Sequence, residues 1–242
     1  MKIKAILFDL GETLINFGEV DISAVFKEGA RCSYEFLKQT GQEVCGFQRY
    51  YLRNLFLIRT VYVWSCLIGR DFDSLELLKK IGLRRGYKLT EQQWQQFAWL
   101  WYEPLSRIAT VEPDIRDTLT RLRDRGLKLG IVSNTFLTQS SLDRHLKEFG
   151  MIEFFPLRMY SQETAWRKPN VKIFNEAAGR LGIEPQNIMF VGDRLDTDIK
   201  GALKAGMIPI LKSACTNTGK KVPPGVRKII LLSELPSLIQ SI

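Results

Sequence analysis

Hydrophobic and polar positions follow two different patterns along the chain. Short runs of consecutive apolar residues, the first at 3–8, are separated by stretches in which apolar residues recur every three or four positions. Unbroken apolar runs of this length are typical of buried parallel strands, and the longer spacing is typical of amphipathic helices. The pattern therefore predicts an α/β fold.

After Pro113 the two patterns alternate regularly. The apolar runs predict further strands at 128–132, 154–159, 187–191, 207–211 and 228–232. The helical spacing predicts helices at 114–125, 138–149, 170–182 and 196–205, followed by a short one from 233. Strand–helix alternation of this kind implies a Rossmann-like, three-layer core with a parallel sheet between two layers of helices.

The stretch between the first and second predicted strands has a different character. Apolar residues recur at helical spacing in segments 22–39, 47–68, 73–86 and 91–103, and four of the five tryptophans lie within the stretch. Glycines and Pro104 separate these segments. We therefore predict an α-helical domain at 15–108, inserted into a core formed by 1–14 and 109–242.

Composition excludes several classes of protein. The 242 residues include 45% apolar and 25% charged residues, which is ordinary for a globular protein, and no apolar run is long enough to predict a membrane span. The apolar run at 3–8 is too short for the core of a signal peptide. The four cysteines (32, 45, 66 and 215) form no Cys-x-x-Cys pair and predict reduced thiols. These features favour a cytoplasmic protein without a membrane partner.

Polar residues follow several of the predicted strands. Asp9 follows the first strand, Ser133 and Asn134 follow the second, and residues 193–198 follow the fourth. Lys168 precedes a predicted helix. Each residue alone is typical of a turn or helix cap, but the carboxyl ends of parallel strands meet at one edge of a sheet, where ligands bind. Carboxylates, a hydroxyl and a lysine at one edge suit a metal-assisted reaction on an anion.

Four segments carry a resemblance to a known family. Phe-Asp-Leu-Gly-Glu-Thr-Leu (8–14), Gly-Ile-Val-Ser-Asn-Thr (130–135), Arg-Lys-Pro-Asn (167–170) and Val-Gly-Asp-Arg-Leu-Asp-Thr-Asp-Ile-Lys-Gly-Ala (191–202) resemble, in order and spacing, the four motifs of the haloacid dehalogenase-like hydrolase superfamily. The helical insert matches the position of the cap domain in the first subclass of that superfamily. The resemblance implies the α/β core with an inserted cap that the patterns predict.

The resemblance also implies roles for individual residues. Asp9 would be the nucleophile that attacks phosphorus and forms an aspartyl-phosphate. Asp9, the backbone carbonyl of Gly11, and Asp193 would hold a Mg²⁺ ion. Asp198 would support this metal site and Lys168.

The substrate-binding residues implied by the resemblance come from two other motifs. Ser133 and the backbone at Asn134 would hold the phosphoryl oxygens. Lys168 would neutralise the charge of the group being transferred and keep Asp9 ionised. The implied activity is that of a Mg²⁺-dependent phosphatase acting on a small phosphorylated metabolite, as a monomer or a homodimer.

The first motif departs from the pattern usual in the phosphatases of this superfamily. They read Asp-x-Asp-Gly-Thr, and the second Asp acts as general acid and base, whereas this chain has Gly11 at that position. One interpretation is a phosphatase in which water, a cap residue or a good leaving group compensates. A second is that the neighbouring Glu12 replaces the missing carboxyl. A third is a slow enzyme, or a protein that binds phosphorylated ligands without turning them over.

Other chemistries of the superfamily fit the sequence less well. Haloacid dehalogenases have an aromatic residue at the position of Gly11 and lack the pair Gly192-Asp193. Phosphonate-cleaving relatives pair a cap lysine with a cap histidine, and the predicted cap contains no histidine. The only histidine, His145, falls in the predicted helix 138–149, where a solvated side chain is expected.

The charge of the chain adds little to this interpretation. The net charge is +9, and residues 15–108 hold 13 Lys or Arg against 10 Asp or Glu, so the excess is spread over the chain. No helix-turn-helix, zinc finger or RNA-binding motif accompanies it, and nucleic acid is not expected as a partner. Residues 212–221 are predicted to form a basic surface loop.

Overall fold

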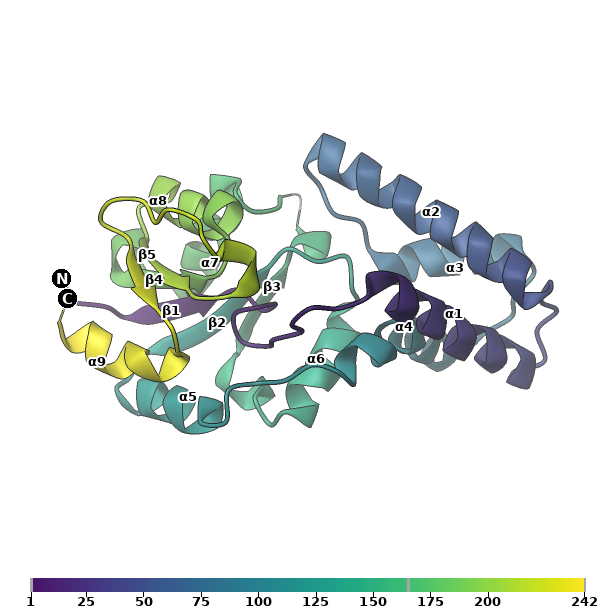
Figure 1. Cartoon of the computed structure of the whole chain (residues 1–242), viewed down its shortest axis with the longest axis horizontal. Helices are drawn as coiled ribbons and strands as arrows, with labels where there is room; N and C mark the ends of the chain where they lie inside the picture. Colours follow the sequence, from purple (N-terminus) through teal and green to yellow (C-terminus); the bar gives the residue numbers. More distant parts are fainter. Residues whose placement is uncertain (1, 165, 242) are drawn as a thin grey trace. The chain divides into compact units, whose positions relative to one another are not determined.

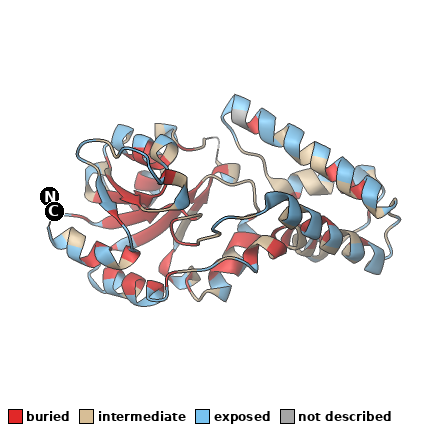
Figure 2. Cartoon of the chain, viewed as in Figure 1, coloured by how far each residue is buried: buried red, intermediate tan, exposed pale blue. Residues whose placement is uncertain are grey.

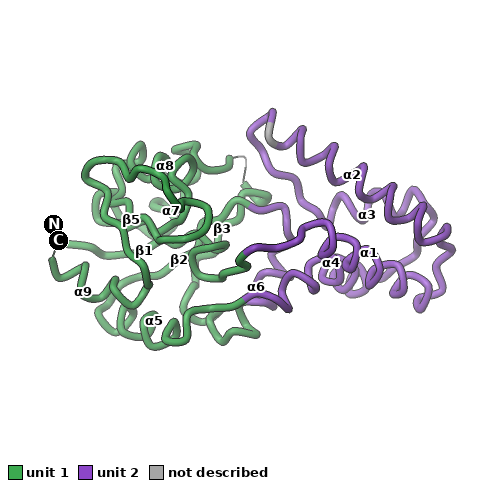
Figure 3. The backbone as a smooth tube through the Cα atoms, viewed as in Figure 1, with its two compact units in different colours: residues 1–18, 110–134, 146–242 green, residues 19–109, 135–145 purple. Residues whose placement is uncertain are grey.

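The computed structural model describes residues 2–164 and 166–241 (Figure 1). The chain divides into two compact units (Figure 3). We call residues 1–18, 110–134 and 146–242 the core unit, and residues 19–109 and 135–145 the helical unit.

The core unit is built on a six-stranded parallel sheet. Its strands are β1 (Ala5–Phe8), β2 (Lys128–Ser133), β3 (Leu157–Tyr160), β4 (Ile188–Gly192), β5 (Ile208–Lys212) and β6 (Arg227–Ile229). They lie in the order β3-β2-β1-β4-β5-β6. The chain winds one way from β1 to β3 and the other way from β4 to β6, so the strand order reverses beside β1. The predicted α/β fold with a parallel sheet is confirmed.

Helices cover both faces of this sheet. Figure 1 shows α7 (Val171–Leu181) and α8 (Lys200–Lys204) on one face, and α5 (Ile115–Asp124) and α9 (Leu235–Gln240) on the other. The strands are buried between these layers, and Figure 2 shows the sheet almost entirely as buried residues. Leu7 of β1, for example, belongs to a buried cluster with Phe174 of α7. Burial on both faces explains why the strands read as continuous apolar runs.

The helical unit contains four long helices close to the predicted segments. They are α1 (Ile22–Gln39), α2 (Phe47–Ile68), α3 (Ser74–Arg84) and α4 (Glu91–Ser106). Side chains cap the first turns of α1, α3 and α4, and in α1 the Asp21 carboxylate accepts from the amides of Ser23 and Ala24. A buried cluster that includes Leu37, Tyr50 and Trp94 holds the unit together. A further helix, α6 (Gln139–Glu148), continues from the helical unit into the core unit along the chain.

Several predicted boundaries differ from the observed ones. β3 begins at Leu157 and not at 154, because Ile152–Phe154 forms a 3₁₀ turn. β6 ends at Ile229, since the Glu234 carboxylate accepts the amides of Ile230 and Leu231, which then cannot pair in the sheet. The predicted helix 196–205 begins as a π-helical turn, Leu195–Ile199, before α8.

Three further sequence expectations concern the surface and the thiols. No helix among the described residues combines the length and apolar character needed to cross a membrane. The cysteines at 32, 45 and 215 are free thiols, and the side chain of Cys66 lies outside the described part of the structure. The expectation that 212–221 is a basic surface loop is wrong at its start. Lys212 is buried and pairs with the Glu112 carboxylate at 3.0 Å.

Candidate active site

The ends of β1, β2 and β4 bring polar residues to one edge of the sheet. Phe8 of β1 is in register with Ile131 of β2 and Val191 of β4. Asp9 therefore lies one residue beyond the paired position, and Ser133 and Asp193 two residues beyond it. The Asp9 amide donates to the carbonyl of Val191 at 2.9 Å, so pairing with β4 continues to the aspartate itself.

Lys168 lies between two carboxylates. Its Nζ is 2.7 Å from Asp9 Oδ1 and 2.6 Å from Asp198 Oδ1, and only 2% of Lys168 is exposed. Burial lowers the pKa of Lys168, but the charges of Asp198 and Asp9 outweigh burial and leave that pKa above its usual value. The ammonium group is therefore a fixed positive charge beside Asp9.

The side chain of Asn134 holds Lys168 in position. Its amide Nδ2 donates to the carbonyl of Lys168 at 2.9 Å, and its Oδ1 accepts from the amide of Lys168 at 2.8 Å. This pair of bonds connects the end of β2 to the loop before α7. The side chain of Asn134 is thus committed to the backbone of Lys168.

Asp9, Asp193 and Asp198 form a buried cluster of carboxylates. One oxygen from each lies within 4.8 Å of the others, and the three side chains come from the ends of β1 and β4 and from the π-helical turn. Burial, followed by the negative charge of Asp9, raises the pKa of Asp193 to about 7. Three carboxylates lie beside a single ammonium group, that of Lys168. With all three carboxylates ionised, the cluster therefore has a net negative charge.

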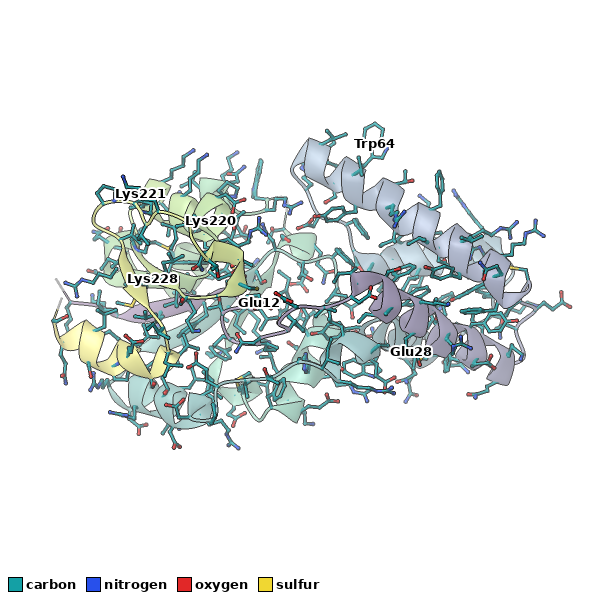
Figure 4. The ribbon with its side chains drawn as sticks, in the orientation of Figure 1. Glu12, Glu28, Trp64, Lys220, Lys221 and Lys228 are labelled. Carbon is teal, nitrogen blue, oxygen red and sulfur yellow. The ribbon has the colours of Figure 1, made fainter. Side chains whose placement is uncertain are left out.

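The loop after β5 contributes groups that sequence reasoning missed. Thr216 Oγ1 donates to Asp193 Oδ2, and Asn217 Nδ2 donates to the carbonyl oxygen of Asp193 at 2.8 Å. Thr13 Oγ1 lies 3.3 Å from the other carboxylate oxygen of Asp193. Lys220 and Lys221, at the far end of this loop, are exposed as predicted (Figure 4). A Thr-Asn pair in a loop carries no signal in sequence, so only the folded chain reveals that it contacts Asp193.

Asp198 is positioned by its own turn. Its Oδ2 accepts the amide of Arg194 at 3.0 Å. A Cβ atom on Gly192 would lie 2.6 Å from Cβ and Cγ of Asp198, closer than real Cβ atoms approach. Glycine at position 192 is therefore required by the space that Asp198 occupies.

Comparison with known proteins agrees with the motifs and with this geometry. A model of the haloacid dehalogenase-like hydrolase family matches residues 3–206. The chain belongs to this family.

Several curated relatives are phosphatases. Glyceraldehyde 3-phosphate phosphatase of Methanopyrus kandleri is 33% identical over 211 residues, covering 86% of this chain and 83% of that protein. The enzyme of the same name from Pyrococcus furiosus is 29% identical over 213 residues, covering 85% and 79%. Ribulose-1,5-bisphosphate 5-phosphatase of Halopiger xanaduensis is 31% identical over 111 residues, covering 46% and 45%.

Solved structures show the same fold. A phosphatase of the haloacid dehalogenase superfamily from Thermococcus onnurineus matches with a TM-score of 0.62 and 24% identity, covering 98% of both chains. A 2-haloacid dehalogenase from Pseudomonas syringae matches with a TM-score of 0.63 and 21% identity, covering 99% of both. The two structures match this chain equally well, so the fold does not distinguish phosphatase from dehalogenase chemistry. That distinction has to come from the residues of the site.

The departure in the first motif has a structural counterpart. Glu12, labelled in Figure 4, has a left-handed φ of 56°. Its Oε1 accepts the amide of Phe17 at 2.9 Å, and the Cys215 thiol lies 3.6 Å from its Oε2. The carboxylate of Glu12 is thus hydrogen-bonded within its own loop. This contact argues against Glu12 replacing the missing second aspartate.

The structure leaves room for a Cβ atom on Gly11. A Cβ atom built on Gly11 would have Phe17 Cε2 at 3.7 Å as its nearest neighbour, which is an ordinary van der Waals contact. The backbone at Gly11 therefore tolerates a side chain, and no carboxyl group is present at that position in this chain.

His145 is not the solvated helix residue that the sequence suggested. It is 1% exposed, and its Nδ1 lies 2.7 Å from the hydroxyl oxygen of Tyr102. It shares the buried face of α6 with Leu142 and Leu146. The expectation of solvent exposure is wrong because the polar neighbours of His145 in sequence lie on the other face of the helix.

Proposed function

We propose that this chain is a Mg²⁺-dependent phosphatase that hydrolyses a small phosphorylated metabolite through an aspartyl-phosphate on Asp9. The observation that carries the proposal is the ammonium of Lys168, 2.7 Å from Asp9 in a buried cluster of three carboxylates. The phosphatase names of the relatives support the same reaction. We propose that it acts in the cytoplasm, as a monomer or a homodimer.

The donor set fits Mg²⁺. Magnesium prefers carboxylate and carbonyl oxygens, and the three clustered carboxylates carry negative charge that a divalent cation would neutralise. Asp9, Asp193 and the backbone carbonyl of Gly11 would hold the ion, with Asp198 supporting the site. When bound, the ion would offset the negative charge shared by Asp9 and the phosphoryl oxygens.

In the first step Asp9 acts as nucleophile. One carboxylate oxygen of Asp9 attacks phosphorus, the bond between phosphorus and the ester oxygen breaks, and the departing alkoxide takes a proton from water. Lys168 stabilises the charge on the transferring group, since its ammonium is fixed beside Asp9. Ser133, at the end of β2, would donate its hydroxyl to a phosphoryl oxygen.

In the second step a water molecule attacks the phosphorus of the aspartyl-phosphate. The bond between phosphorus and the Asp9 oxygen breaks, which releases inorganic phosphate and restores the carboxylate. The proton lost by this water passes to solvent, because Gly11 has no side chain that could take it. General acid–base assistance contributes about 10²–10⁴-fold, so we expect a slow phosphatase with its activity towards good leaving groups least affected.

A protein that binds phosphorylated ligands without turnover is the second candidate. Gly11 is the observation that favours it, because both steps lack a proton-transfer group there. Asp9, Lys168 and the carboxylates proposed to hold the metal are nevertheless all present and clustered, which a binding protein would not require. Dehalogenase chemistry is disfavoured because Asp193 adds a third carboxylate that suits a metal-dependent reaction.

One assay separates these candidates. The purified protein should release phosphate from an aryl phosphate with Mg²⁺, and the release should stop with a chelator or in Asp9→Asn. Asp117→Asn, an exposed carboxylate in the first turn of α5, is the matched control and should behave as wild type. Equal phosphate release by wild type and Asp9→Asn would refute the mechanism.

A further inference from the structure

All three oxygen atoms of Asp193 accept hydrogen bonds from other parts of the core unit. Oδ1 accepts from the Thr13 hydroxyl at 3.3 Å, Oδ2 accepts from the Thr216 hydroxyl, and the main-chain oxygen accepts from the Asn217 side-chain amide at 2.8 Å. The Thr13 contact is long for a bond between a hydroxyl and an oxygen, so Thr216 is the firmer restraint on the carboxylate. Because each carboxylate oxygen has about two lone pairs, the carboxylate can still bind a cation.

Two of these donors, Thr216 and Asn217, lie in the loop after β5. Gly192 of β4 is in register with Leu211 of β5, so this loop starts beside the strand end that carries Asp193. The match to the family model ends at residue 206, before the loop begins. The contacts to Asp193 from this loop are therefore not covered by the family match.

Buried groups fix the base of this loop. Nδ2 of Asn217 also donates to the carbonyl of Lys212 at 2.8 Å, so one side-chain amide joins the end of β5 to Asp193. The ammonium of Lys212 pairs with one oxygen of the buried Glu112 carboxylate at 3.0 Å. The other oxygen of Glu112 accepts the amide of Leu232 at 2.8 Å. The loop after β5 thus starts from a base that is held on several sides.

The side chain of Asn217 serves this arrangement only as a donor. It is 2% exposed, and its Oδ1 has no hydrogen-bond partner among the described residues. A buried acceptor without a partner costs about 1–3 kcal/mol, so packing alone does not explain an asparagine at this position. The two hydrogen bonds from Nδ2 do explain it, because they hold the main chain of Asp193 against the end of β5.

We propose that Thr216 is a positioning residue for Mg²⁺ binding, holding the Asp193 carboxylate in the orientation that the ion requires while Asn217 fixes the main chain of Asp193. The inference rests on the proposed function, in which Asp193 holds the ion. Groups that orient a metal ligand typically contribute about 10–100-fold to metal affinity. Since Thr216 acts through Asp193, loss of its hydroxyl weakens Mg²⁺ binding and leaves kcat at saturating Mg²⁺ close to that of wild type.

Thr216→Val tests this role, because valine keeps the shape of threonine and removes the hydroxyl. Titration calorimetry should give a Kd for Mg²⁺ that is about tenfold higher than in wild type. The Mg²⁺ concentration that gives half the maximal rate of phosphate release should rise by the same factor. Thr216→Ser restores the hydroxyl and should restore the affinity. Thr216→Ala removes the hydroxyl with a smaller side chain and should behave as Thr216→Val does.

The matched control lies in the same loop. Thr218 is exposed, and its hydroxyl donates to the carbonyl of Ala214 at 3.3 Å rather than to Asp193. Thr218→Val should therefore bind Mg²⁺ as wild type does. Thermal unfolding with a chelator present shows whether each variant is folded without the metal. Equal weakening of Mg²⁺ binding in Thr218→Val would show a general effect of the loop and would overturn the role of Thr216.

The outcomes distinguish this inference from the proposed function. If wild type binds Mg²⁺ and releases phosphate, and folded Thr216→Val or Thr216→Ala binds Mg²⁺ equally well, the role of Thr216 is overturned and the proposed function stands. If Mg²⁺ binding is weakened in these variants but wild type releases no phosphate, the role of Thr216 is supported and the phosphatase reaction is refuted. A wild type that binds no Mg²⁺ overturns both.

Discussion

At the scale of single residues, Gly11 controls the expected rate. A Cβ atom there makes only an ordinary contact with Phe17, and the backbone at Gly11 does not adopt a left-handed φ, so the main chain accepts a residue larger than glycine. Gly11→Asp should raise kcat for an alkyl phosphate by about 100-fold, since it supplies a general acid and base. Steady-state kinetics with an alkyl phosphate measures the change in kcat. Gly11→Asn is the isosteric control, because its amide cannot act as a general acid or base. Equal rates for wild type and Gly11→Asp would show that another group moves the proton.

Lys168 is central to stability as well as to charge. It is the buried partner of both Asp9 and Asp198. Lys168→Met leaves two buried carboxylates without that partner and should lower the free energy of unfolding by about 3–5 kcal/mol. Urea denaturation measures the loss. Adding Asp198→Asn should recover part of it, whereas strictly additive losses would show that the two residues act independently.

The raised pKa of Asp193 leads us to expect that metal binding depends on pH. Its folded-state pKa of about 7 exceeds the ordinary value of 3.8, so in metal-free protein it reduces stability as the pH rises from about 4 to 7. A cation that requires the ionised carboxylate competes with the proton below pH 7. The rise in Tm caused by Mg²⁺ should therefore be larger at pH 8 than at pH 5.5. Asp193→Asn should remove most of this rise, and a rise that is the same at both pH values would contradict the assignment.

The sequence predicted that the charged residues of the site meet at one edge of the sheet, and the structure brings them together, but the groups that hold them in place were not predicted. Asp9 and Asp198 come after predicted strands and Lys168 lies in a recognisable motif, so their convergence could be expected. Thr216 and Asn217 could not, because a hydrogen bond to Asp193 depends on where the loop after β5 folds back. His145 was misjudged for a related reason, since a buried polar partner such as Tyr102 leaves no trace in local sequence.

At the scale of elements, the end of β4 and the turn after it position Asp198. The turn is π-helical over Leu195–Ile199, a detail that apolar spacing does not predict. Strand interiors were predictable because burial on both faces requires apolar runs, whereas strand ends depend on caps and turns such as those at 152–154 and at Glu234.

Gly192→Ala tests this part of the structure. The new methyl group would overlap Asp198, so we expect a large loss of kcat together with a lower Tm. Gly179→Ala is the matched control, because a Cβ atom there meets nothing within 4 Å. In helix α7 that alanine should be neutral or stabilise the protein by up to about 1 kcal/mol. Full activity in Gly192→Ala would show that Asp198 is not needed where it lies.

For the molecule as a whole, the sequence predicted the general fold better than the packing of individual side chains. Strand–helix alternation was enough to predict the α/β fold with its parallel sheet, and helical spacing was enough to predict helices α1 to α4. The buried cluster of the helical unit was not predictable residue by residue, because side chains of α1 to α4 meet there only after folding. The net charge of +9 played no part in locating the site, which is acidic.

The proposed reaction passes through a covalent phosphoryl intermediate on Asp9. Because Gly11 leaves the second step without a general base, the intermediate should accumulate after mixing with an aryl phosphate and Mg²⁺. Rapid acid quenching followed by mass spectrometry should show one added phosphoryl group on the peptide that contains Asp9, and none in Asp9→Asn. Phosphate release by wild type with no labelled Asp9 peptide at any time, and with undiminished release by Asp9→Asn, would contradict this mechanism.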